Sequence, residues 1–552
     1  MKNYPLNKVE YYDRFRDMIE SIAEKYGDAP AISWFTRKQE EMGVTYNQLR
    51  DDVRYLQEML IEMGLAGKHI AVVGENSYEW ILVYFAANYC GSTVVCIDVE
   101  QSDETILQML AMADTDAIFL SSAFCDVCSQ YAGQDKKMFL LTGKGGKVPT
   151  VRNLIEDGKW IWQEGRENKE IDKKVKPDDT AAIVFTSGTT SRSKPVMLSQ
   201  SAILTNASDA LANVTINTGE RTFTNLPFYH TYGLTCSVLS MLIPGSHLFI
   251  NGNLKTVMKD LHMAKAHTLL TVPLMLETIY SKIWLSAEES GKAESLKKLF
   301  SLKKIQFSLG IKKSGKTLDA IREKCLGTIE LVICGGAHVS HDIMEQFRYM
   351  GVNVLQGYGI TECAPLVSVN RNKANKLDSV GLVTAHCEVK LEDGEILVRG
   401  KNLMKGYYNA PELTEEVMKD GWFYTGDVGE IDKEGYLFIT GRKKNLIVFK
   451  NGKKVAPEKL EEKISNIPLV QDVMVYGAAS GASTDDVQIA ASIYPNQEKT
   501  EGMTSYEILE TLQAEINKIN NDLPIYQQIQ MINIREQEFS KTALKKIKRH
   551  LV

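Results

Sequence analysis

The sequence predicts an α/β protein with a large N-terminal domain of parallel sheets covered by helices, a small β-barrel-like subdomain, and a small α+β domain at the C-terminus. Apolar runs of strand length alternate with helical runs from residue 44 to about residue 355. Short β runs separated by Gly and Asp turns follow, and strands and a helix return after Gly441. A chain of 552 residues with 44% apolar content also exceeds what one hydrophobic core usually organises.

The first elements show the alternation clearly. Thr45 and Gln48 form a capping-box pattern, after which apolar residues recur at helical spacing until Gly64. A β-branched apolar run follows at residues 69–73, then an apolar helical segment at 80–89 and a strand pattern at 91–97. Strand, helix and strand joined by short loops predict a parallel sheet covered on both faces.

The same alternation continues through the next half of the chain. It predicts further strands at residues 181–185, 222–226, 247–250, 268–272, 330–334 and 353–355. After residue 380, short β runs at 388–391, 395–399 and 435–439 predict an antiparallel or barrel-like subdomain that ends near Thr440. Beyond Gly441, strands at 470–476 and 487–493 and a helix at 505–519 predict a unit large enough to fold alone.

Composition and charge exclude several classes of protein. A net charge of -6 argues against a general nucleic-acid-binding surface. Nine cysteines at irregular spacing indicate reduced thiols rather than a disulfide framework, and the N-terminus lacks the apolar core of a secretory signal. No apolar run reaches the ~18 to 20 residues of a bilayer span. We therefore expect a cytoplasmic protein without an integral membrane span.

A charged excursion occupies residues 281–324. Between residues 292 and 324, ten Lys and Arg residues face three Asp and Glu residues. The pattern favours a solvated surface loop. Peripheral contact with anionic lipid headgroups is the alternative, because clustered basic residues bind such surfaces.

A loop rich in small hydroxylated residues follows the strand expected at residues 181–185. It reads Thr186-Ser-Gly-Thr-Thr-Ser-Arg-Ser-Lys194. Gly188 opens backbone angles that other residues avoid, hydroxyls and amides can turn onto anionic oxygens, and Lys194 adds a positive charge. The loop is typical of a phosphate site, although most isolated Ser/Thr/Gly runs are solvated turns.

The stretch Gln356-Gly-Tyr-Gly-Ile-Thr-Glu362 fits other parts of a nucleotide. Its glycines let the backbone approach a planar ligand on which Tyr358 can stack. Thr361 can hydrogen-bond a phosphate, and Glu362 is an oxygen ligand suited to Mg²⁺ bridging phosphate oxygens. Taken alone, the stretch also fits a strand-to-loop turn with a capping Glu.

Asp427 ends a Tyr-Thr-Gly-Asp stretch that we interpret as a glycine turn. Its carboxylate can accept hydrogen bonds from a ribose diol, and a surface-turn Asp is the competing interpretation. With Gly441-Arg-Lys-Lys444 and the C-terminal stretch around Lys546, these motifs stand in an order that resembles one family. The chain resembles, over essentially its full length, the adenylate-forming superfamily of acyl-CoA synthetases, adenylation domains and luciferases, and within it bacterial AMP-forming long-chain fatty acid CoA ligases.

The resemblance implies a two-step ligase reaction that uses a carboxylic acid, ATP, Mg²⁺ and coenzyme A. The carboxylate attacks the α-phosphorus of ATP and expels pyrophosphate, and the CoA thiol then attacks the acyl-adenylate. Lys546 matches the family lysine that bridges the reacting carboxylate and phosphate. At ~4 Å and an effective dielectric near 20, a unit-charge pair is worth about 4 kcal/mol, so this cation can offset their repulsion.

Further site residues are carried over from matched positions. The β- and γ-phosphates are expected to contact Thr186, Ser187, Gly188, Thr189, Thr190 and Lys194. The adenine is expected to lie against Gly336, Ala337, Gly357 and Tyr358, the ribose against Asp427 and Arg442, and Mg²⁺ against Glu362 beside Thr361. His230 is a candidate gate or orienting residue near the carboxylate, or equally a core histidine paired with a backbone carbonyl.

The resemblance also implies two domains and a hinge. Residues 1–443 would form the AMP-binding domain, and residues 444–552 a mobile lid that pivots at Lys444 between the half-reactions. Gly452 would then enter the site and leave space for the pantetheine arm of CoA. An apolar slot for the acyl chain is expected near residues 235–242 and 273–276.

Two departures from the family pattern and two rival functions remain. Ser191 and Pro195 stand where the family usually has glycine. Ser191 narrows the allowed backbone angles and Pro195 removes an amide donor, so we expect a looser phosphate cradle.

One rival function is that of a stand-alone ligase that loads the phosphopantetheine of an acyl carrier protein. The other is a non-catalytic sensor that binds an acyl-adenylate.

Overall fold

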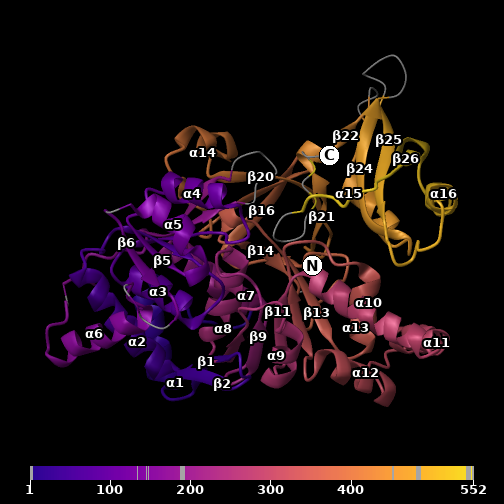
Figure 1. Cartoon of the computed structure of the whole chain (residues 1–552). Coiled ribbons are helices and arrows are strands. Elements are labelled where there is room, and N and C mark those ends of the chain that lie inside the picture. The colour runs from indigo at the N-terminus through magenta and orange to yellow at the C-terminus, as the bar shows by residue number, and fades with distance from the viewer. Residues whose placement is uncertain are drawn as a thin grey trace.

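The N-terminal part of the computed structural model is built around two large sheets (Figure 1). The structure describes residues 4–133, 135–143, 146, 148–168, 170–186, 193–449, 453–479, 487–541, 547 and 549. The first sheet has seven strands, in the order β18 (Gly406–Tyr407), β8 (Pro195–Ser199), β7 (Thr180–Phe185), β4 (Thr93–Cys96), β3 (His69–Val73), β5 (Ala117–Leu120) and β6 (Lys137–Leu140). Strands β7, β4, β3, β5 and β6 run parallel, whereas β8 and β18 are antiparallel to their neighbours.

Helices cover both faces of this sheet. They are α2 (Tyr46–Glu62), α3 (Tyr78–Tyr89), α4 (Asp103–Met112), α5 (Cys125–Ala132) and α6 (Val151–Gln163), with a short 3₁₀ turn η1 (Ser122–Phe124). Ile70 and Val72 of β3 belong to the core that contains α2 and α3, whereas Ala71 and Val73 belong to the core that contains α4 and α5. Both faces of β3 are therefore buried, which explains why its sequence is apolar without alternation.

The second sheet has nine strands. Their order is β15 (Leu382–Val383), β14 (Leu366–Val369), β13 (Asn353–Gly359), β12 (Leu331–Cys334), β11 (Thr268–Thr271), β9 (Arg221–Thr224), β10 (His247–Ile250), β1 (Pro30–Phe35) and β2 (Glu41–Thr45). Its helices are α1 (Phe15–Tyr26), α7 (Gln200–Asn213), α8 (Ser240–Leu242), α9 (Val257–Ala264), α10 (Pro273–Glu289), α11 (Ala293–Ser308), α12 (Lys316–Leu326) and α13 (His341–Tyr349), with the π-helix η2 (Tyr232–Leu239). The five strands from β13 to β10 run parallel, as the sequence predicts.

A five-stranded antiparallel subdomain follows, as expected. It contains β16 (Cys387–Glu392), β17 (Glu395–Gly400), β20 (Trp422–Ile431), β19 (Met418–Lys419) and β21 (Leu437–Arg442), with α14 (Pro411–Val417) beside it. The prediction that Asp427 lies on a glycine turn is wrong. It lies within the ten-residue strand β20, directly opposite Arg442 of β21, because aromatic and β-branched residues around it favour a strand.

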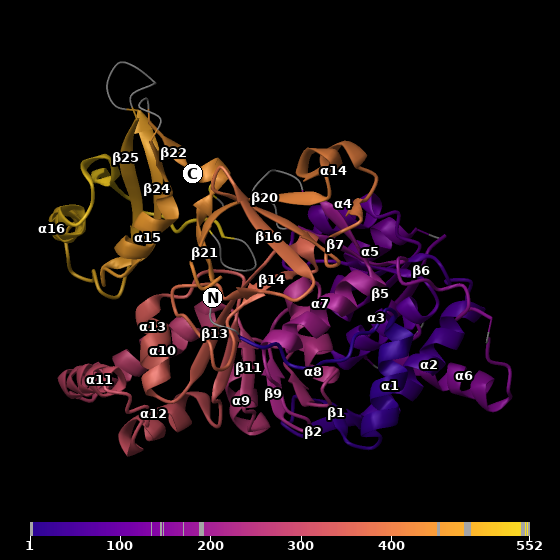
Figure 2. The same ribbon diagram turned by 180° about the vertical axis from the view of Figure 1, so that it is seen from behind.

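The C-terminal unit has a core of its own. After the turn η4 (Lys443–Asn445) come β22 (Ile447–Val448), β23 (Lys454–Val455), α15 (Pro457–Ser465), β24 (Val470–Ala479), β25 (Val487–Pro495), α16 (Ser505–Asn521), the turn η5 (Ile525–Gln527) and β26 (Ile529–Ile534). The prediction lacks β26, which pairs in parallel with β25. Figures 1 and 2 show this unit standing apart from the N-terminal body, joined to it at β21.

The excursion at residues 281–324 is helical, so its interpretation as a surface loop is wrong. It comprises the end of α10, all of α11 and most of α12. Leu296 and Phe300 of α11 and Leu318 of α12 are buried in the core beside the nine-stranded sheet. These apolar contacts explain why a segment with so many lysines is folded.

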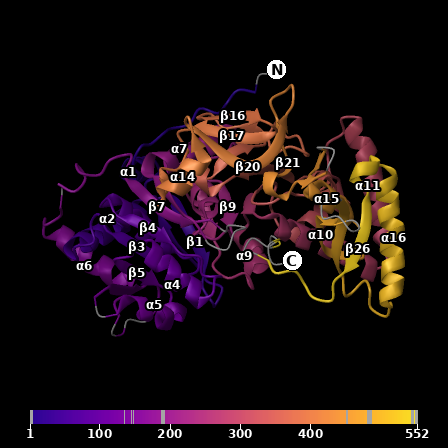
Figure 3. The same cartoon turned by 90° about the horizontal axis from the view of Figure 1, so that it is seen from above.

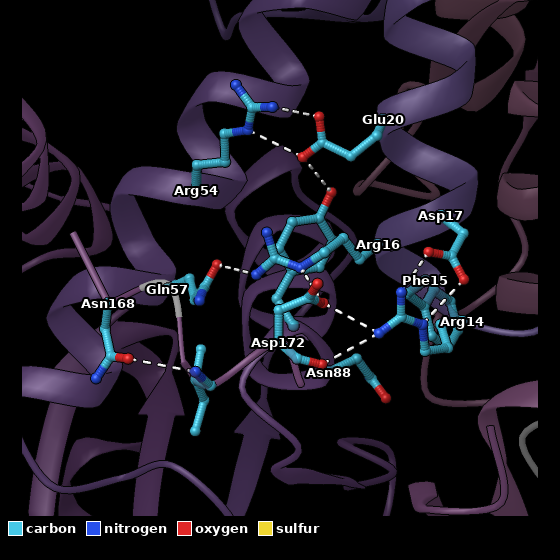
Figure 4. Close-up of polar contacts among 12 residues, drawn as sticks. Arg14, Phe15, Arg16, Asp17, Glu20, Arg54, Gln57, Asn88, Asn168 and Asp172 are labelled. Atoms are coloured by element: carbon cyan, nitrogen blue, oxygen red, sulfur yellow. Dashed lines mark hydrogen bonds and ion pairs between the residues drawn. The ribbon is translucent and has the colours of Figure 1, made fainter. Parts of the chain in front are cut away.

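Polar contacts fix the segment that leads into β7 (Figure 4). Arg14 and Arg16, at the start of α1, pair with Asp172 at 3.1 and 2.8 Å. The backbone N–H of Asn168 donates to Glu58 of α2 at 2.9 Å. The approach to the strand before the phosphate loop is therefore held against two helices.

Among the described residues, no helix combines the length and the apolar character that a membrane crossing requires.

Candidate active site

The base of the predicted phosphate loop is a closed hairpin. The N–H of Thr186 donates to the carbonyl of Lys194 at 3.1 Å, and the N–H of Lys194 donates to Oγ1 of Thr186 at 3.4 Å. The predicted phosphate contacts Ser187, Gly188, Thr189 and Thr190, and the departure at Ser191, lie outside the described residues. Pro195 begins β8 opposite Phe185, a strand-end position that needs no donor from it.

Asp427 lies at the centre of a polar cluster. Its carboxylate, with a side chain 4% exposed, accepts from Nε of Arg442 at 2.7 Å and from the hydroxyl of Tyr358 at 2.7 Å. Burial, with the neighbouring carboxylate, raises the pKa of Tyr358, so the phenol remains a neutral donor. Three residues predicted to surround the nucleoside, from β13, β20 and β21, are therefore in direct contact.

A second cluster joins Glu362 to the phosphate loop. Glu362 lies on the 3₁₀ turn η3 (Thr361–Cys363), next to Thr361, and its Oε1 accepts from the hydroxyl of Tyr407 at 2.8 Å. Nζ of Lys194 lies 4.9 Å from the centre of the Tyr407 ring. Burial raises the pKa of Glu362, whereas Tyr407 and Lys194 act to lower it. A cation beside this carboxylate would offset the energetic cost of burying its negative charge.

The residues of the second cluster fit a Mg²⁺ ion that is held mainly by substrate. Among the described residues, no three His, Cys, Asp or Glu side chains gather as a metal-binding group. Magnesium typically takes one or two protein carboxylates and completes its shell with phosphate oxygens and water. Glu362, a half-buried carboxylate near a lysine of the phosphate loop, meets that requirement.

The loop after β12 forms the predicted adenine edge. Gly336 has φ +90, and a Cβ at Gly335 would lie 3.3 Å from the Tyr232 ring, so both positions favour glycine. Ala337 lies next in this exposed loop. Gln356, 3% exposed, has an Oε1 atom without a partner in the described part of the chain. That oxygen can accept a hydrogen bond from an amino group such as that of adenine.

The glycines of β13 allow close pairing of strands. A Cβ at Gly357 would lie 3.3 Å from the carbonyl oxygen of Ser368, and one at Gly359 would lie 2.6 Å from that of Pro365. Substitution at either position would push β13 away from β14. The glycines thereby hold Tyr358 at the end of the sheet, facing Asp427.

His230 lies beside a small internal cavity. The cavity is lined by His230, Thr235, Val184 and Leu198, among others, at the start of the π-helix η2. Nε2 of His230 is buried and has no partner among the described residues, and burial lowers the pKa of the ring below its usual value. The carbonyl-paired alternative does not account for that nitrogen. π-Helices often mark functional sites, and this one adjoins the expected acyl slot.

The chain passes from the polar cluster to the C-terminal unit through η4. Burial and the adjacent Arg442 lower the pKa of Lys444, whereas the charge of Asp427 acts to raise it. A Cβ at Gly441 would lie 2.8 Å from the Cβ of Ala456 and from a carboxylate oxygen of Glu458. The C-terminal unit therefore packs closely against the end of β21.

Ion pairs between described residues also join the two parts of the chain. Nε2 of His338, in the adenine loop, lies 3.0 Å from Oε1 of Glu462 on α15. Lys499 pairs with Glu288 of α10 at 3.1 Å. Polar contacts of this kind are typical of domains that move relative to each other.

Lys546, the predicted catalytic residue, and Gly452, the predicted pantetheine contact, lie outside the described residues. The flanking residues of the C-terminal stretch are anchored to the C-terminal unit. Lys541 pairs with Asp472 at 2.7 Å, and Arg549 pairs with Glu461 of α15 and donates to the carbonyl of Val475 at 3.0 Å. Lys541 and Arg549, which flank Lys546 in the sequence, are thus tied to β24 and α15.

Comparison with known proteins identifies the family. A sequence model described as AMP-binding enzyme matches residues 19–408, and one described as AMP-binding enzyme C-terminal domain matches residues 444–552. The chain belongs to the AMP-binding enzyme family. The adenylate-forming resemblance seen in its motifs is therefore confirmed.

Curated relatives cover most of the chain at low identity. The "Probable acyl-activating enzyme 16, chloroplastic" of Arabidopsis thaliana is 27% identical over 92% of this chain and 80% of its own length. The "Long-chain-fatty-acid--CoA ligase FadD15" of Mycobacterium bovis is 26% identical over 79% and 75%. The Arabidopsis thaliana "Long-chain-fatty-acid--[acyl-carrier-protein] ligase AEE15, chloroplastic" is 26% identical over 90% and 78%.

Solved structures share the fold. The anthranilate CoA ligase AuaEII, in complex with anthranoyl-AMP, superposes with a TM-score of 0.78 at 16% identity, over 98% of this chain and 96% of its own. The o-succinylbenzoate CoA synthetase of Bacillus subtilis, with ATP and magnesium, gives 0.73 at 20% identity over 97% and 98%. The predicted fold class is confirmed, and the family supports an adenylate-forming acid–CoA ligase activity.

Sequence reasoning missed Tyr407 and the acceptor oxygen of Gln356. Tyr407 lies in the two-residue strand β18, which joins β8 only through a long-range antiparallel pairing. No local motif surrounds it, so nothing in the sequence indicated its contact with Glu362. Gln356 stands inside the motif at residues 356–362. Its unpaired Oε1 atom can be recognised only from a structure, in which the partners of buried polar atoms can be counted.

We predict that Tyr407→Phe weakens the use of Mg²⁺ and ATP without unfolding the protein. The variant loses the hydrogen bond to Glu362 and keeps the ring beneath Lys194. A hydrogen bond to a charged group is worth about 1.5 to 3 kcal/mol, so kcat/KM for ATP should fall about tenfold or more in steady-state assays.

Tyr408→Phe is the matched control for this variant. The Tyr408 hydroxyl bonds Asp114 at 2.9 Å and not Glu362. Its kcat/KM for ATP should equal that of the unaltered protein. Equal losses in the two variants would contradict the assignment of Tyr407.

Proposed function

We propose that this protein activates a medium- or long-chain fatty acid with ATP and transfers it to coenzyme A. The observation that carries the proposal is the convergence of two clusters, Tyr358 with Asp427 and Arg442, and Glu362 with Tyr407 and Lys194. The first cluster suits a ribose and adenine, and the second suits phosphates with a divalent cation. An AMP-binding family member with both clusters intact is equipped for adenylation.

The first half-reaction joins a carboxylate to the α-phosphate. The carboxylate oxygen forms a bond to the α-phosphorus, and the bond to the pyrophosphate oxygen breaks. Lys194 and the loop from Thr186 would hold the β- and γ-phosphates, while Asp427 and Arg442 would hold the ribose. Glu362 would hold a Mg²⁺ ion, whose positive charge would stabilise the departing pyrophosphate. Lys546 would add positive charge between the two reacting anions.

The second half-reaction needs a different arrangement. The sulfur of CoA attacks the acyl carbonyl carbon, and the bond to the AMP oxygen breaks. Lys546 has no task in this step, so rotation of residues 444–552 about Lys444 would withdraw it and open a path for the thiol. The polar contacts of His338 with Glu462 and of Lys499 with Glu288 are few enough to be exchanged in such a rotation.

The choice of a fatty acid rests on the relatives and on the region around His230. Relatives are named as long-chain acyl-CoA synthetases or ligases. The cavity beside His230 is lined mainly by apolar side chains and has a volume of about 10 Å³, so η2 would have to move before an acyl chain could enter it. The unpaired Nε2 of His230, on a ring that burial keeps neutral, would then meet the carboxylate end.

A carrier-protein acceptor is the second candidate function. One relative is named as a ligase for acyl carrier protein, and it matches 90% of this chain. Both functions share the adenylation step and differ only in the thiol that enters. The distinction therefore needs a measurement of the acceptor.

We predict that purified protein with ATP and Mg²⁺ converts straight-chain fatty acids and CoA to acyl-CoA, AMP and pyrophosphate in equal amounts. Turnover should exceed that of benzoate and anthranilate by about tenfold or more, the discrimination that an apolar pocket can supply. Pyrophosphate release with thioester only on holo carrier protein would favour the second candidate. A preference for aryl acids, or no turnover with any acid, would contradict the proposal.

We predict that Lys444→Pro slows thioester formation much more than adenylate formation. Proline fixes φ and would restrict the backbone rotation that the second pose requires. Rapid-quench assays that follow acyl-adenylate and acyl-CoA separately would measure both steps. Lys444→Ala removes the same charge without the restriction and should leave the ratio of the two rates unchanged. Equal slowing of both steps by the proline variant would contradict the hinge.

A further inference from the structure

Helix α11 has two apolar faces, and only one of them is buried. Leu296 and Phe300 pack into the core beside the nine-stranded sheet, and Phe307 packs against the same core. Leu302, Ile305 and Leu309 are 51%, 59% and 72% exposed. At about 100° per residue, these three side chains lie on the side of the helix opposite the buried ones. Ile311, 51% exposed, continues the apolar surface after the helix ends.

Exposed lysines precede and follow the apolar residues in the sequence. Seven lysines and no acidic residue occur between Ser295 and Leu318. Lys297 and Lys298 are exposed on α11, and Lys312 and Lys313 are exposed directly after Ile311. The set of Leu302, Ile305, Leu309 and Ile311 with these four lysines is called the α11 patch below.

The acidic groups nearby neutralise little of this charge. Lys304, 68% exposed, pairs with Glu345 of α13 at 3.5 Å. Lys303 is turned inward, where it donates to Gln306 at 2.8 Å and to the carbonyl of Lys313 at 2.9 Å, and so ties the loop to the helix. None of the four lysines of the patch, all of which are described residues, forms an ion pair with another described residue.

The patch lies at the edge of the molecule. In Figures 1 and 2, which view the molecule from opposite sides, α11 projects from the outer end of the N-terminal body. Figure 3 shows it at the same outer end from above. Helix α11 is therefore peripheral in the molecule.

We propose that the α11 patch docks on the surface of a bilayer that contains anionic phospholipids. Leucine and isoleucine side chains of a helix lying in the plane of an interface enter the boundary between headgroups and acyl chains, and flanking lysines attract the anionic headgroups. The patch combines exposed apolar side chains with exposed lysines close to them in the sequence. A contiguous exposed apolar surface rimmed by one sign of charge also marks an interaction site in general.

Vesicle co-sedimentation of the full chain tests the docking. The unaltered protein should sediment with vesicles of about 60% phosphatidylcholine and 40% phosphatidylglycerol, and much less with phosphatidylcholine alone, because the lysines need anionic headgroups. Raising the salt concentration about tenfold should release most of the bound protein. The combined variant Leu302→Ser, Ile305→Ser and Leu309→Ser, and the combined variant Lys297→Gln, Lys298→Gln and Lys312→Gln, should each bind about tenfold less.

Matched controls separate the patch from general surface effects. Leu254→Ser, Tyr506→Ser and Ile525→Ser remove three other exposed apolar side chains, and Lys68→Gln, Lys173→Gln and Lys518→Gln lower the net charge equally elsewhere. Both control variants should bind vesicles like the unaltered protein. Binding of the patch variants equal to that of the controls, or no vesicle binding by the unaltered protein, would overturn the proposal.

Two further measurements complete the test. ATP–pyrophosphate exchange with a short, water-soluble acid should be unchanged in both patch variants, which shows that they are folded. Light scattering after size exclusion, without lipid, reports the oligomeric state. A patch variant that dissociates an oligomer, together with failure of the unaltered protein to sediment, would make the patch an interface between copies and overturn membrane docking.

Discussion

Repulsion among anions is the constraint that the active site must solve. A triphosphate and a carboxylate have to meet inside a protein whose own Asp427 and Glu362 are also acidic. The cations come from separate parts of the fold: Lys194 after β7, Arg442 at the end of β21 and Lys444 in η4. Arg442 is already paired with Asp427 at 2.7 Å, so it orients that carboxylate rather than adding free charge. In the proposed reaction, Mg²⁺ and Lys546 would supply the rest of the positive charge.

The way the sheets end brings these groups together. Strand β7 of the first sheet ends at the phosphate loop, β13 of the second sheet ends at Tyr358 and η3, and β20 and β21 of the subdomain carry Asp427 and Arg442. The C-terminal unit has its own core and touches this region through a close approach at Gly441 and a few polar contacts. A fold of this kind can hold a nucleotide in one rigid body and bring a further charge on another. Docking of the α11 patch on a bilayer would let a fatty acid reach the protein directly from the membrane.

Much of the fold followed from the sequence. Fully apolar runs such as residues 69–73 predicted strands buried on both faces, and the capping box at Thr45 placed the start of α2 correctly. The sequence misplaces Asp427 because the glycine before it suggests a turn, whereas the flanking Trp, Phe, Tyr and Val residues form β20. The helices of the basic excursion were missed because its lysine density hid the buried stripe of Leu296 and Phe300. Tyr407 and the unpaired oxygen of Gln356 depend on pairings between distant segments, which no local pattern contains.

In the proposed reaction, Lys546 lowers the barrier to acyl-adenylate formation and takes no part in thioester formation. Single-turnover measurement of acyl-adenylate from ATP and a fatty acid, in Lys546→Ala and in the neighbouring control Lys548→Ala, tests it most directly. We expect the rate to fall about a hundredfold or more in Lys546→Ala alone, the size of effect seen when one group that stabilises transition-state charge is removed. Acyl-CoA formation from supplied acyl-adenylate should stay near the unaltered rate. An unchanged rate of acyl-adenylate formation in Lys546→Ala would contradict the account.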